Sequence, residues 1–274
     1  MSISRSVIIP AHNEAACLPD LLAELQTVLD KMPGTSEILV IDDGSTDETP
    51  AVLEHWSVRE PRLRWFRLNG NFGQSSAFDA GFRAARGDVL ITLDADGQNP
   101  PSEIPKLLAA LDGCDMVCGW RNGRQDHWTK YLASKFANTL RRWFLKDGIH
   151  DTGCSLKAFR RTTVARIKLF HGLHRFLPVL VQMEGFKVRE IRVAHRARSG
   201  GQSHYGILNR MFGPLVDMLA VRWMLTRARK WHATEVTADA DISNGSTIIK
   251  IPNRAKSTDA ANVEYSNSAS GENI

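Results

Sequence analysis

Cysteine is scarce in this sequence, and its spacing suits neither a disulfide framework nor a zinc site. Among 274 residues there are four cysteines, and no two of them form a Cys-x-x-Cys pair. No histidines stand beside them at zinc-finger spacing. They are Cys17, Cys114, Cys118 and Cys154. We therefore expect four reduced, buried thiols, the usual state of free cysteine in a protein interior.

Three motifs that would identify a common enzyme class are also missing. No Gly-x-Gly-x-x-Gly follows the first predicted strand, no Gly-x-x-x-x-Gly-Lys-Ser/Thr occurs, and the nine histidines form no His-Glu-x-x-His. The sequence thus lacks the phosphate-binding signals of dinucleotide-binding and P-loop proteins and the ligand pattern of a zinc hydrolase. A phosphorylated ligand would need a different anchor.

Long apolar runs are absent as well. The segment from Ile207 to Arg229 has helical spacing and a broad apolar face, but Asp217 and Arg222 interrupt it. Its apolar stretches are far shorter than the roughly 20 residues that a membrane-spanning helix requires. Residues of the kind favoured in a lipid headgroup layer close the segment: Arg227, Arg229, Lys230 and Trp231. We expect residues 207–231 to form an amphipathic helix at the membrane surface, with packing on the domain as the alternative.

Charge is unevenly distributed along the chain. The formal net charge is +5, and residues 232–274 carry six acidic against three basic residues, so the preceding part is distinctly basic at +8. A basic surface suits polyanions, whether nucleic acid, anionic lipid or a phosphorylated substrate. Residues 232–274 are polar, lack apolar periodicity and are expected to form a disordered tail. No signal peptide precedes the first apolar run, so we expect a cytoplasmic protein.

Short apolar segments alternate with segments of helical pattern through the first two thirds of the chain. The predicted strands cover residues 6–9, 37–41, 63–68, 88–93 and 115–119, and the predicted helices cover 14–31, 46–59, 75–86, 102–111 and 128–144. This alternation predicts an α/β fold in which helices cover a mostly parallel sheet. Asn13, and Ser45 together with Glu48, have the pattern of helix N-caps.

Polar residues gather where four of these strands end. In an open parallel sheet, ligands bind at the carboxyl ends of the strands. The four strands run into Pro10-Ala11-His12-Asn13-Glu14, Asp42-Asp43-Gly44-Ser45, Asp94-Ala95-Asp96-Gly97-Gln98 and Gly119-Trp120-Arg121. We therefore expect one ligand site at this edge of the sheet.

Two carboxylates, Asp94 and Asp96, directly follow the apolar strand at residues 88–93. Residues two apart in an extended chain point to the same side, so both carboxylates can reach one hard cation. A bound Mg²⁺ or Mn²⁺ would neutralise a diphosphate and stabilise it as a leaving group. The alternative is a turn in which both side chains only accept hydrogen bonds from backbone amides.

Three segments in this order resemble the motifs of family 2 glycosyltransferases: residues 6–14 (SVIIPAHNE), 40–47 (VIDDGSTD) and 94–98 (DADGQ). The resemblance covers about residues 5–230. It is strongest with the branch that contains dolichyl-phosphate mannosyltransferases and bacterial polyprenyl-phosphate glycosyltransferases. It implies a GT-A catalytic domain over residues 1–206, a divalent metal ion, and a nucleotide-diphosphate sugar as donor.

The resemblance also implies roles for individual residues. Positions that hold the nucleotide's base and ribose are matched by Pro10, His12, Glu14, Ile41 and Asp43, with His12 where tyrosine is common. The metal and diphosphate segment is matched by Asp94, Ala95, Asp96 and Gln98, with Arg121 near the phosphates.

A loop that closes over the nucleotide in the family has the pattern Arg-x-x-Gly-x-Ser-Lys, and residues 198–206 match it. Arg198 and Ser203 are kept, whereas His204 replaces the lysine. A histidine is only partly charged near neutral pH, so this phosphate contact is either lost or dependent on pH.

Acceptor contacts are expected from two further segments. Residues 134–138 resemble the family's Ser-Arg-Gly-Ala-Asn segment, which receives the acceptor phosphate, and Lys130 and Lys135 are the candidate contacts. A solvated basic face is the alternative. Asp151 lies in a segment that resembles one near the family's active site and is a candidate general base. A hydroxyl acceptor needs such a base, whereas a lipid phosphate is already an anion.

The resulting hypothesis is a single displacement with inversion. A hexose passes from GDP-mannose or a UDP-sugar to a polyprenyl or dolichyl phosphate, with the enzyme peripherally bound at the cytoplasmic membrane face and no nucleic-acid partner. The main alternative is a family 2 enzyme that transfers to a saccharide or cell-envelope hydroxyl. A non-catalytic protein that binds nucleotides or nucleic acid ranks lower, because two acidic strand ends face the expected ligand site.

Overall fold

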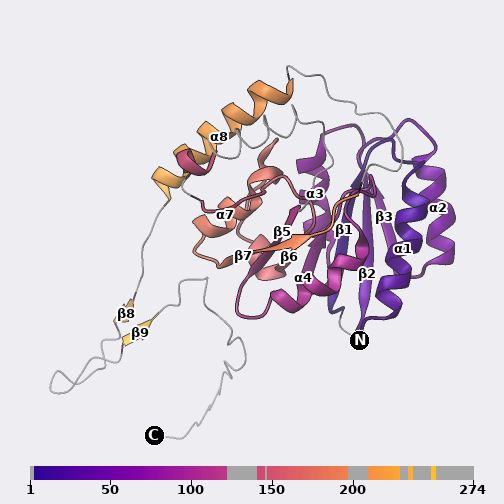
Figure 1. Cartoon of the computed structure of the whole chain (residues 1–274), viewed down its shortest axis with the longest axis horizontal. Helices are drawn as coiled ribbons and strands as arrows, with labels where there is room; N and C mark the ends of the chain where they lie inside the picture. The colour runs from indigo at the N-terminus through magenta and orange to yellow at the C-terminus, as the bar shows by residue number, and fades with distance from the viewer. Residues whose placement is uncertain are drawn as a thin grey trace, which may run out of the picture. The chain divides into compact units, whose positions relative to one another are not determined.

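The chain divides into two units, Met1–Ala228 and Arg229–Ile274. The computed structural model describes residues 3–121, 141–145, 147–196, 209–228, 234–236 and 248–250. The first unit holds a sheet covered by helices (Figure 1). In the second unit, β8 (Thr234–Val236) pairs antiparallel with β9 (Ile248–Lys250). The disorder expected for residues 232–274 stays a prediction for the rest of that segment.

The first unit is built on a seven-stranded sheet with the order β3-β2-β1-β4-β6-β5-β7. Its strands are β1 (Arg5–Ala11), β2 (Ser36–Asp42), β3 (Leu63–Arg67), β4 (Val89–Thr92), β5 (Met116–Arg121), β6 (Lys157–Arg160) and β7 (Val188–Val193). Only β6 runs antiparallel to its neighbours β4 and β5. The mostly parallel α/β fold is therefore confirmed, and the five strands predicted from the sequence are β1 to β5. Their carboxyl ends lie at the same edge of the sheet.

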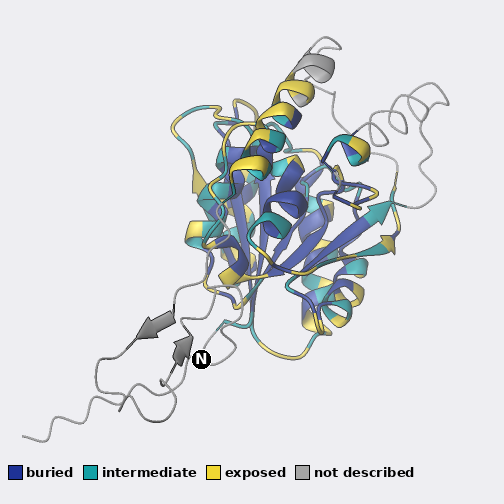
Figure 2. Cartoon of the chain, turned by 90° about the vertical axis from the view of Figure 1, so that its left-hand side faces the viewer, coloured by how far each residue is buried: buried dark blue, intermediate teal, exposed yellow. Residues whose placement is uncertain are grey.

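Helices cover both faces of this sheet because alternate strand residues point to opposite sides. Val7 and Ile9 of β1 belong to the large apolar cluster formed with α1 (Leu18–Asp30), α2 (Thr49–Arg59) and α4 (Ile104–Ala110), which follows the 3₁₀ turn η1 (Pro101–Glu103). Ile8 faces α3 (Gln74–Ala84) on the other side, where a Cβ at Gly81 would clash with its side chain. The buried strands lie between these layers (Figure 2).

A smaller apolar cluster holds the later helices together. These are the 3₁₀ turn η2 (Leu173–Phe176), α7 (Leu177–Met183) and α8 (Asn209–Arg227), and they follow the short helix α6 (Arg161–Val164), which contributes no residue to the cluster. Leu173 and Phe176 of η2 pack with Met218 and Val221 of α8. Within the described parts of the chain, no helix has both the length and the apolar composition needed to span a bilayer.

Two predicted helix starts are wrong. The first helix begins at Leu18 rather than at residue 14, and the second begins at Thr49 rather than at residue 46. A proline occupies the first turn of each, where its fixed φ favours a start and its missing N–H costs nothing. Asn13 and Ser45 therefore cap neither helix. Their hydrogen bonds instead connect the two loops that precede α1 and α2.

Candidate active site

The loops that follow β1 and β2 are tied together by side chains from both. The backbone N–H of Asn13, which has a φ of 56°, donates to Ser45 Oγ at 2.9 Å. Asn13 Oδ1 accepts from the backbone N–H of Thr46 at 2.8 Å, and the N–H of Glu14 donates to Thr49 Oγ1 at 2.9 Å. The two motifs that suggested a nucleotide site thus form one rigid rim of the sheet.

His12 and Asp43 extend this rim to the segment before α3. Nδ1 of His12 lies 2.8 Å from the carbonyl oxygen of Asp43. The Asp43 carboxylate is buried and accepts from the backbone N–H groups of Phe72 and Gly73 at 2.8 and 2.7 Å. Asp43 therefore holds this loop, and its predicted contact with a nucleotide base stays a prediction.

The other predicted nucleotide contacts lie along the same edge. Pro10 and Ile41 are register partners in β1 and β2, and both are buried. Ala95 belongs to the large apolar cluster. The carbonyl oxygen of Gln98 accepts from the backbone N–H of Arg196 at 2.8 Å, so the chain leaving β7 is joined to the segment that carries the two aspartates.

Asp94 is held by two side chains at the end of β4. Nε2 of Gln74 donates to Asp94 Oδ1 at 2.7 Å, and Ser155 also bonds to the carboxylate. Burial, reinforced by the negative charge of Asp96, raises the pKa of Asp94 to about 6. The alternative of a simple turn fits Asp96, whose Oδ1 accepts from the backbone N–H of Gln98 at 3.1 Å, but not Asp94.

This donor set fits a divalent cation. Two neighbouring carboxylates whose mutual repulsion raises a pKa are stabilised when a cation takes the place of the proton. Mg²⁺ is commonly held by one or two carboxylates, with phosphate and water oxygens as its other ligands. Among the described residues, there is no group of three or more His, Cys, Asp or Glu side chains that could hold a metal ion by itself. Asp94 and Asp96 would therefore share the cation with the diphosphate of a substrate.

Arg121 and Asp151 form a buried ion pair beside this site. Nε and Nη2 of Arg121 donate to the two carboxylate oxygens of Asp151 at 2.7 and 2.9 Å. The backbone N–H of Gly153 also donates to this carboxylate, at 3.1 Å. Arg121 was expected near the phosphates and Asp151 as a possible base. The structure brings them together, and both roles stay predictions.

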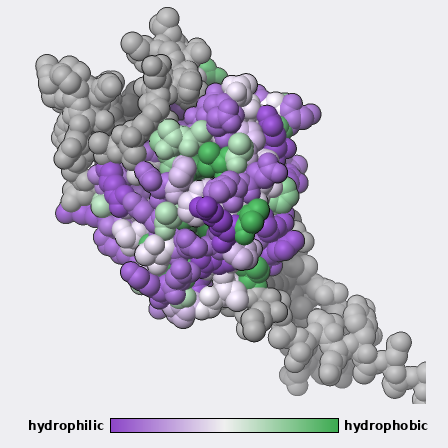
Figure 3. Space-filling model, turned by 90° about the vertical axis from the view of Figure 1, so that its right-hand side faces the viewer, coloured by the Kyte–Doolittle hydropathy of each residue, from purple (hydrophilic) through white to green (hydrophobic). Residues whose placement is uncertain are grey.

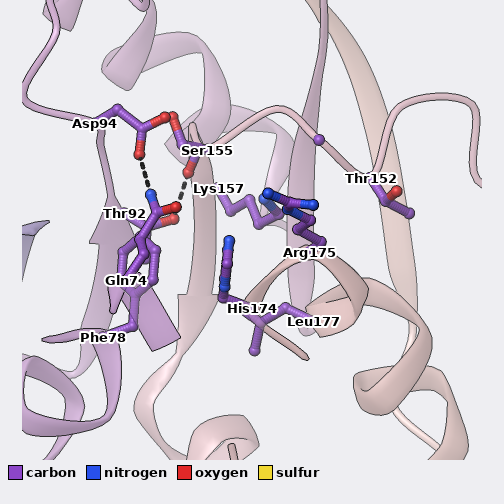
Figure 4. Close-up of a pocket in the computed structure, with 11 residues that line it drawn as sticks. Gln74, Phe78, Thr92, Asp94, Thr152, Ser155, Lys157, His174, Arg175 and Leu177 are labelled. Atoms are coloured by element: carbon purple, nitrogen blue, oxygen red, sulfur yellow. Dashed lines mark hydrogen bonds between the residues drawn. The ribbon is translucent and has the colours of Figure 1, made fainter. Parts of the chain in front are cut away.

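A cavity of about 180 Å³ adjoins Asp94, and several of the residues that line it were not predicted from the sequence. Gln74 comes from the start of α3, Lys157 from β6, and His174 and Arg175 from η2 (Figure 4). The Asn- and Gly-rich segment at residues 69–73, which follows β3, was a usable signal for Gln74. No local pattern marks the other three.

Several predicted contacts lie outside the described residues. They are Lys130, Lys135, Arg198, Ser203 and His204. The predicted thiols, by contrast, are all described, and all four are buried and outside any disulfide, as expected. Burial raises the pKa of Cys154 to about 11, which keeps this thiol protonated beside the site.

Comparisons with known proteins agree with the motifs. Residues 6–167 match the family described as Glycosyl transferase family 2. An undecaprenyl-phosphate 4-deoxy-4-formamido-L-arabinose transferase from Aeromonas hydrophila subsp. hydrophila is 39% identical over 208 residues, which are 74% of this chain and 63% of that protein. The chain thus spans 63% of the length of this curated relative.

Solved structures share the fold at low sequence identity. A mannosyltransferase from Pyrobaculum calidifontis, in complex with GDP-Man and Mn²⁺, has a TM-score of 0.63 and 21% identity over 84% of this chain and 66% of that chain. A glucosyl-3-phosphoglycerate synthase from Mycobacterium tuberculosis, in complex with Mn²⁺, UDP and phosphoglyceric acid, has a TM-score of 0.63 and 16% identity over 90% and 86%. Motifs, sheet and family match lead to one conclusion: this chain belongs to glycosyl transferase family 2 and has the GT-A fold.

Proposed function

We propose that this protein transfers a sugar from a nucleotide-diphosphate donor to a polyprenyl phosphate at the cytoplasmic face of a membrane. The observation that carries the proposal is the carboxylate pair Asp94 and Asp96 beside a cavity at the carboxyl edge of the sheet. The curated relative supports the acceptor, because its name describes an undecaprenyl-phosphate transferase. The solved relatives support a nucleotide-sugar donor and a divalent metal, since they hold GDP-Man or UDP together with Mn²⁺.

The reaction is a single displacement. An oxygen of the acceptor phosphate forms a bond to the anomeric carbon while the bond from that carbon to the donor diphosphate breaks. The nucleoside diphosphate leaves with the electron pair, and the configuration of the sugar inverts. A divalent cation at Asp94 and Asp96 would neutralise the charge on the leaving group. A phosphate acceptor already carries an anionic oxygen and needs no general base, which agrees with an Asp151 carboxylate already bound by Arg121.

The donor's nucleotide is proposed to lie against the rim formed by the loops after β1 and β2. His12, Glu14 and Asp43 belong to this rim, and their hydrogen bonds fix its shape before a ligand arrives. The motifs fit both guanosine and uridine donors, so the nucleotide is to be identified by testing a panel of GDP- and UDP-sugars.

Membrane binding is proposed for the exposed face of α8. Met218 and Val221 on one side of this helix are buried, so it packs on the domain, as the alternative interpretation required. Its other side exposes Leu215, Val216, Leu219 and Trp223, the last at 64% (Figure 2). By contrast, the face on the side of α2 is mainly hydrophilic, with apolar residues in small groups (Figure 3). Exposed apolar side chains with basic residues at the helix end favour an anionic lipid surface.

The experiment that tests the proposal compares the wild-type protein with Asp96→Ala. Wild-type protein should transfer labelled sugar to polyprenyl phosphate with Mg²⁺ or Mn²⁺, and the variant should lose this activity while its circular dichroism spectrum stays unchanged. Retained transfer by the variant at added metal would contradict the role of Asp96. Hydrolysis of the donor without labelling of the lipid would instead indicate a hydroxyl acceptor.

A further inference from the structure

The cavity next to Asp94 is too small for a whole nucleotide sugar. Its volume of about 180 Å³ lies below the roughly 300–1,000 Å³ of sites that enclose drug-sized ligands. Asp94 and Gln74 lie on one side of it, and Lys157 and Arg175 lie on the other (Figure 4). Such a cavity can receive one charged group of a substrate that approaches the metal site.

The side formed by β6 and η2 is positively charged. Lys157 is only 4% exposed, and its ammonium group donates to the backbone carbonyl of Cys154. Arg175 is exposed at the cavity. Asp94 interacts electrostatically with Lys157, and Asp217 with Arg175, but within the described residues neither cation has a carboxylate at ion-pair distance. A buried cation is costly unless an anion compensates it, so this side of the cavity favours an anionic ligand.

His174, which also lines the cavity, is uncharged. Burial, together with the smaller effect of the neighbouring charges of Arg175, Lys157 and His171, lowers its pKa to about 3. The ring is therefore neutral at physiological pH, with Nδ1 lying 2.7 Å from Ser75 Oγ. A neutral ring leaves Lys157 and Arg175 as the charges that a ligand meets.

The positive side of the cavity is also joined to the helix proposed to bind the membrane. A side chain at Gly172, which precedes η2 and has a φ of 80°, would clash with Asp217 of α8. Leu173 and Phe176 of η2 pack in the same apolar cluster as α8. A lipid held against α8 would therefore find Arg175 of η2 close to the membrane surface.

From these contacts we propose that Lys157 and Arg175 bind the phosphate monoester of the lipid acceptor in this cavity. The inference rests on the proposed function, since it adds two residues to the acceptor site of that reaction, for which Lys130 and Lys135, outside the described residues, were the expected contacts. Attack requires the phosphate oxygen to come within about 3–3.5 Å of the anomeric carbon, on the face away from the leaving diphosphate. With Asp94 on one side of the cavity and two cations on the other, the two phosphate groups would lie on opposite sides of the sugar, as this attack requires.

The test compares Arg175→Gln and Lys157→Met with the matched control Arg59→Gln. Arg59 is exposed at the C-terminal end of α2, at the sheet edge opposite the site. With undecaprenyl phosphate in detergent micelles as acceptor, Arg175→Gln should raise the KM for the acceptor roughly 10- to 100-fold, the range expected for losing a charged hydrogen bond. The KM for the donor should stay within about twofold. Lys157→Met keeps the length of the side chain and should act in the same direction.

A binding measurement separates this inference from the proposed function. Geranyl phosphate, a short phosphate monoester, is titrated into the protein without donor and followed by ³¹P NMR. Binding should weaken at least tenfold in Arg175→Gln but not in Arg59→Gln, whether or not the wild-type protein catalyses transfer. Absence of transfer with this binding intact would refute the proposed function alone.

Two results would overturn the inference itself. The first is a raised donor KM with an unchanged acceptor KM in both variants, which would assign the cavity to the donor sugar. The second is competition by inorganic phosphate as strong as that by geranyl phosphate, which would assign the cations to a free anion and not to a lipid.

Discussion

Replacing Asp94 by Asn should stabilise the metal-free protein while removing its activity. A carboxyl whose pKa rises from 3.8 to about 6 on folding favours its protonated form in the folded state. Its contribution to stability is therefore fully present below pH 3.8 and is lost as the pH rises through about 6. At 1.36 kcal/mol for each pKa unit, the ionised carboxylate costs the folded state about 3 kcal/mol at pH 8 and roughly half of that at pH 5.

Asparagine removes this cost and keeps an oxygen that can accept the hydrogen bond from Gln74. Urea denaturation with chelator should thus give Asp94→Asn a larger free energy of unfolding than the wild type, with a gain at pH 8 of about twice that at pH 5. Adding Mn²⁺ should raise the stability of the wild type only. Asp79→Asn is the control, because Asp79 forms an exposed pair with Arg83 and its loss should change stability by less than about 1 kcal/mol at both pH values.

The reasoning would be refuted if Asp94→Asn destabilised the metal-free protein equally at pH 5 and pH 8. That result would mean that hydrogen bonds and nearby charges already stabilise the ionised Asp94 carboxylate in the folded protein. No cation would then be needed to balance its charge beside Asp96.

Two further substitutions test the ion pair and the membrane surface. Asp151→Ala leaves the buried guanidinium of Arg121 without its carboxylate and should lower the free energy of unfolding by about 3–5 kcal/mol in urea denaturation. A loss below about 1 kcal/mol would show that the pair is not structural. Trp223→Ser removes a large exposed apolar side chain from α8 and should weaken sedimentation with anionic vesicles roughly tenfold.

The vesicle experiment has a matched control on another helix. Val58 is 83% exposed on α2, so Val58→Ser removes an apolar side chain from a surface with no proposed lipid contact. Vesicle binding by this variant should equal that of the wild type. Equal losses in both variants would show nonspecific adsorption and would contradict a role of α8 in membrane binding.

The fold could be predicted wherever strands are buried on both faces. β1, β2 and β4 each contain a continuous apolar run because helices cover both sides of them, and such runs are visible in the sequence. β7 was missed because it lies at the edge of the sheet and alternates Val, Arg, Glu, Ile and Arg. β6 was missed because it has four residues and begins with Lys157, whose charge interrupts the apolar pattern.

The site could be predicted where its residues directly follow strands that are visible in the sequence. Asp94 and Asp96 follow a strand, so their convergence is a local property of the chain. The cations of the cavity come from β6 and η2, far along the chain from Asp94, and only the antiparallel insertion of β6 beside β4 brings them together. Helix starts failed for a local reason, because the prolines in the first turns of α1 and α2 were given less weight than polar capping residues.

Sugar transfer itself tests the central claim most directly. Labelled sugar from a panel of UDP- and GDP-sugars is offered to undecaprenyl phosphate and dolichyl phosphate, with Mg²⁺ or Mn²⁺ and with chelator. The account predicts that one donor labels the lipid, that the label requires the metal, and that the product has the inverted configuration. Lipid labelling that persists in chelator, or labelling of a saccharide hydroxyl in preference to either lipid phosphate, would contradict it.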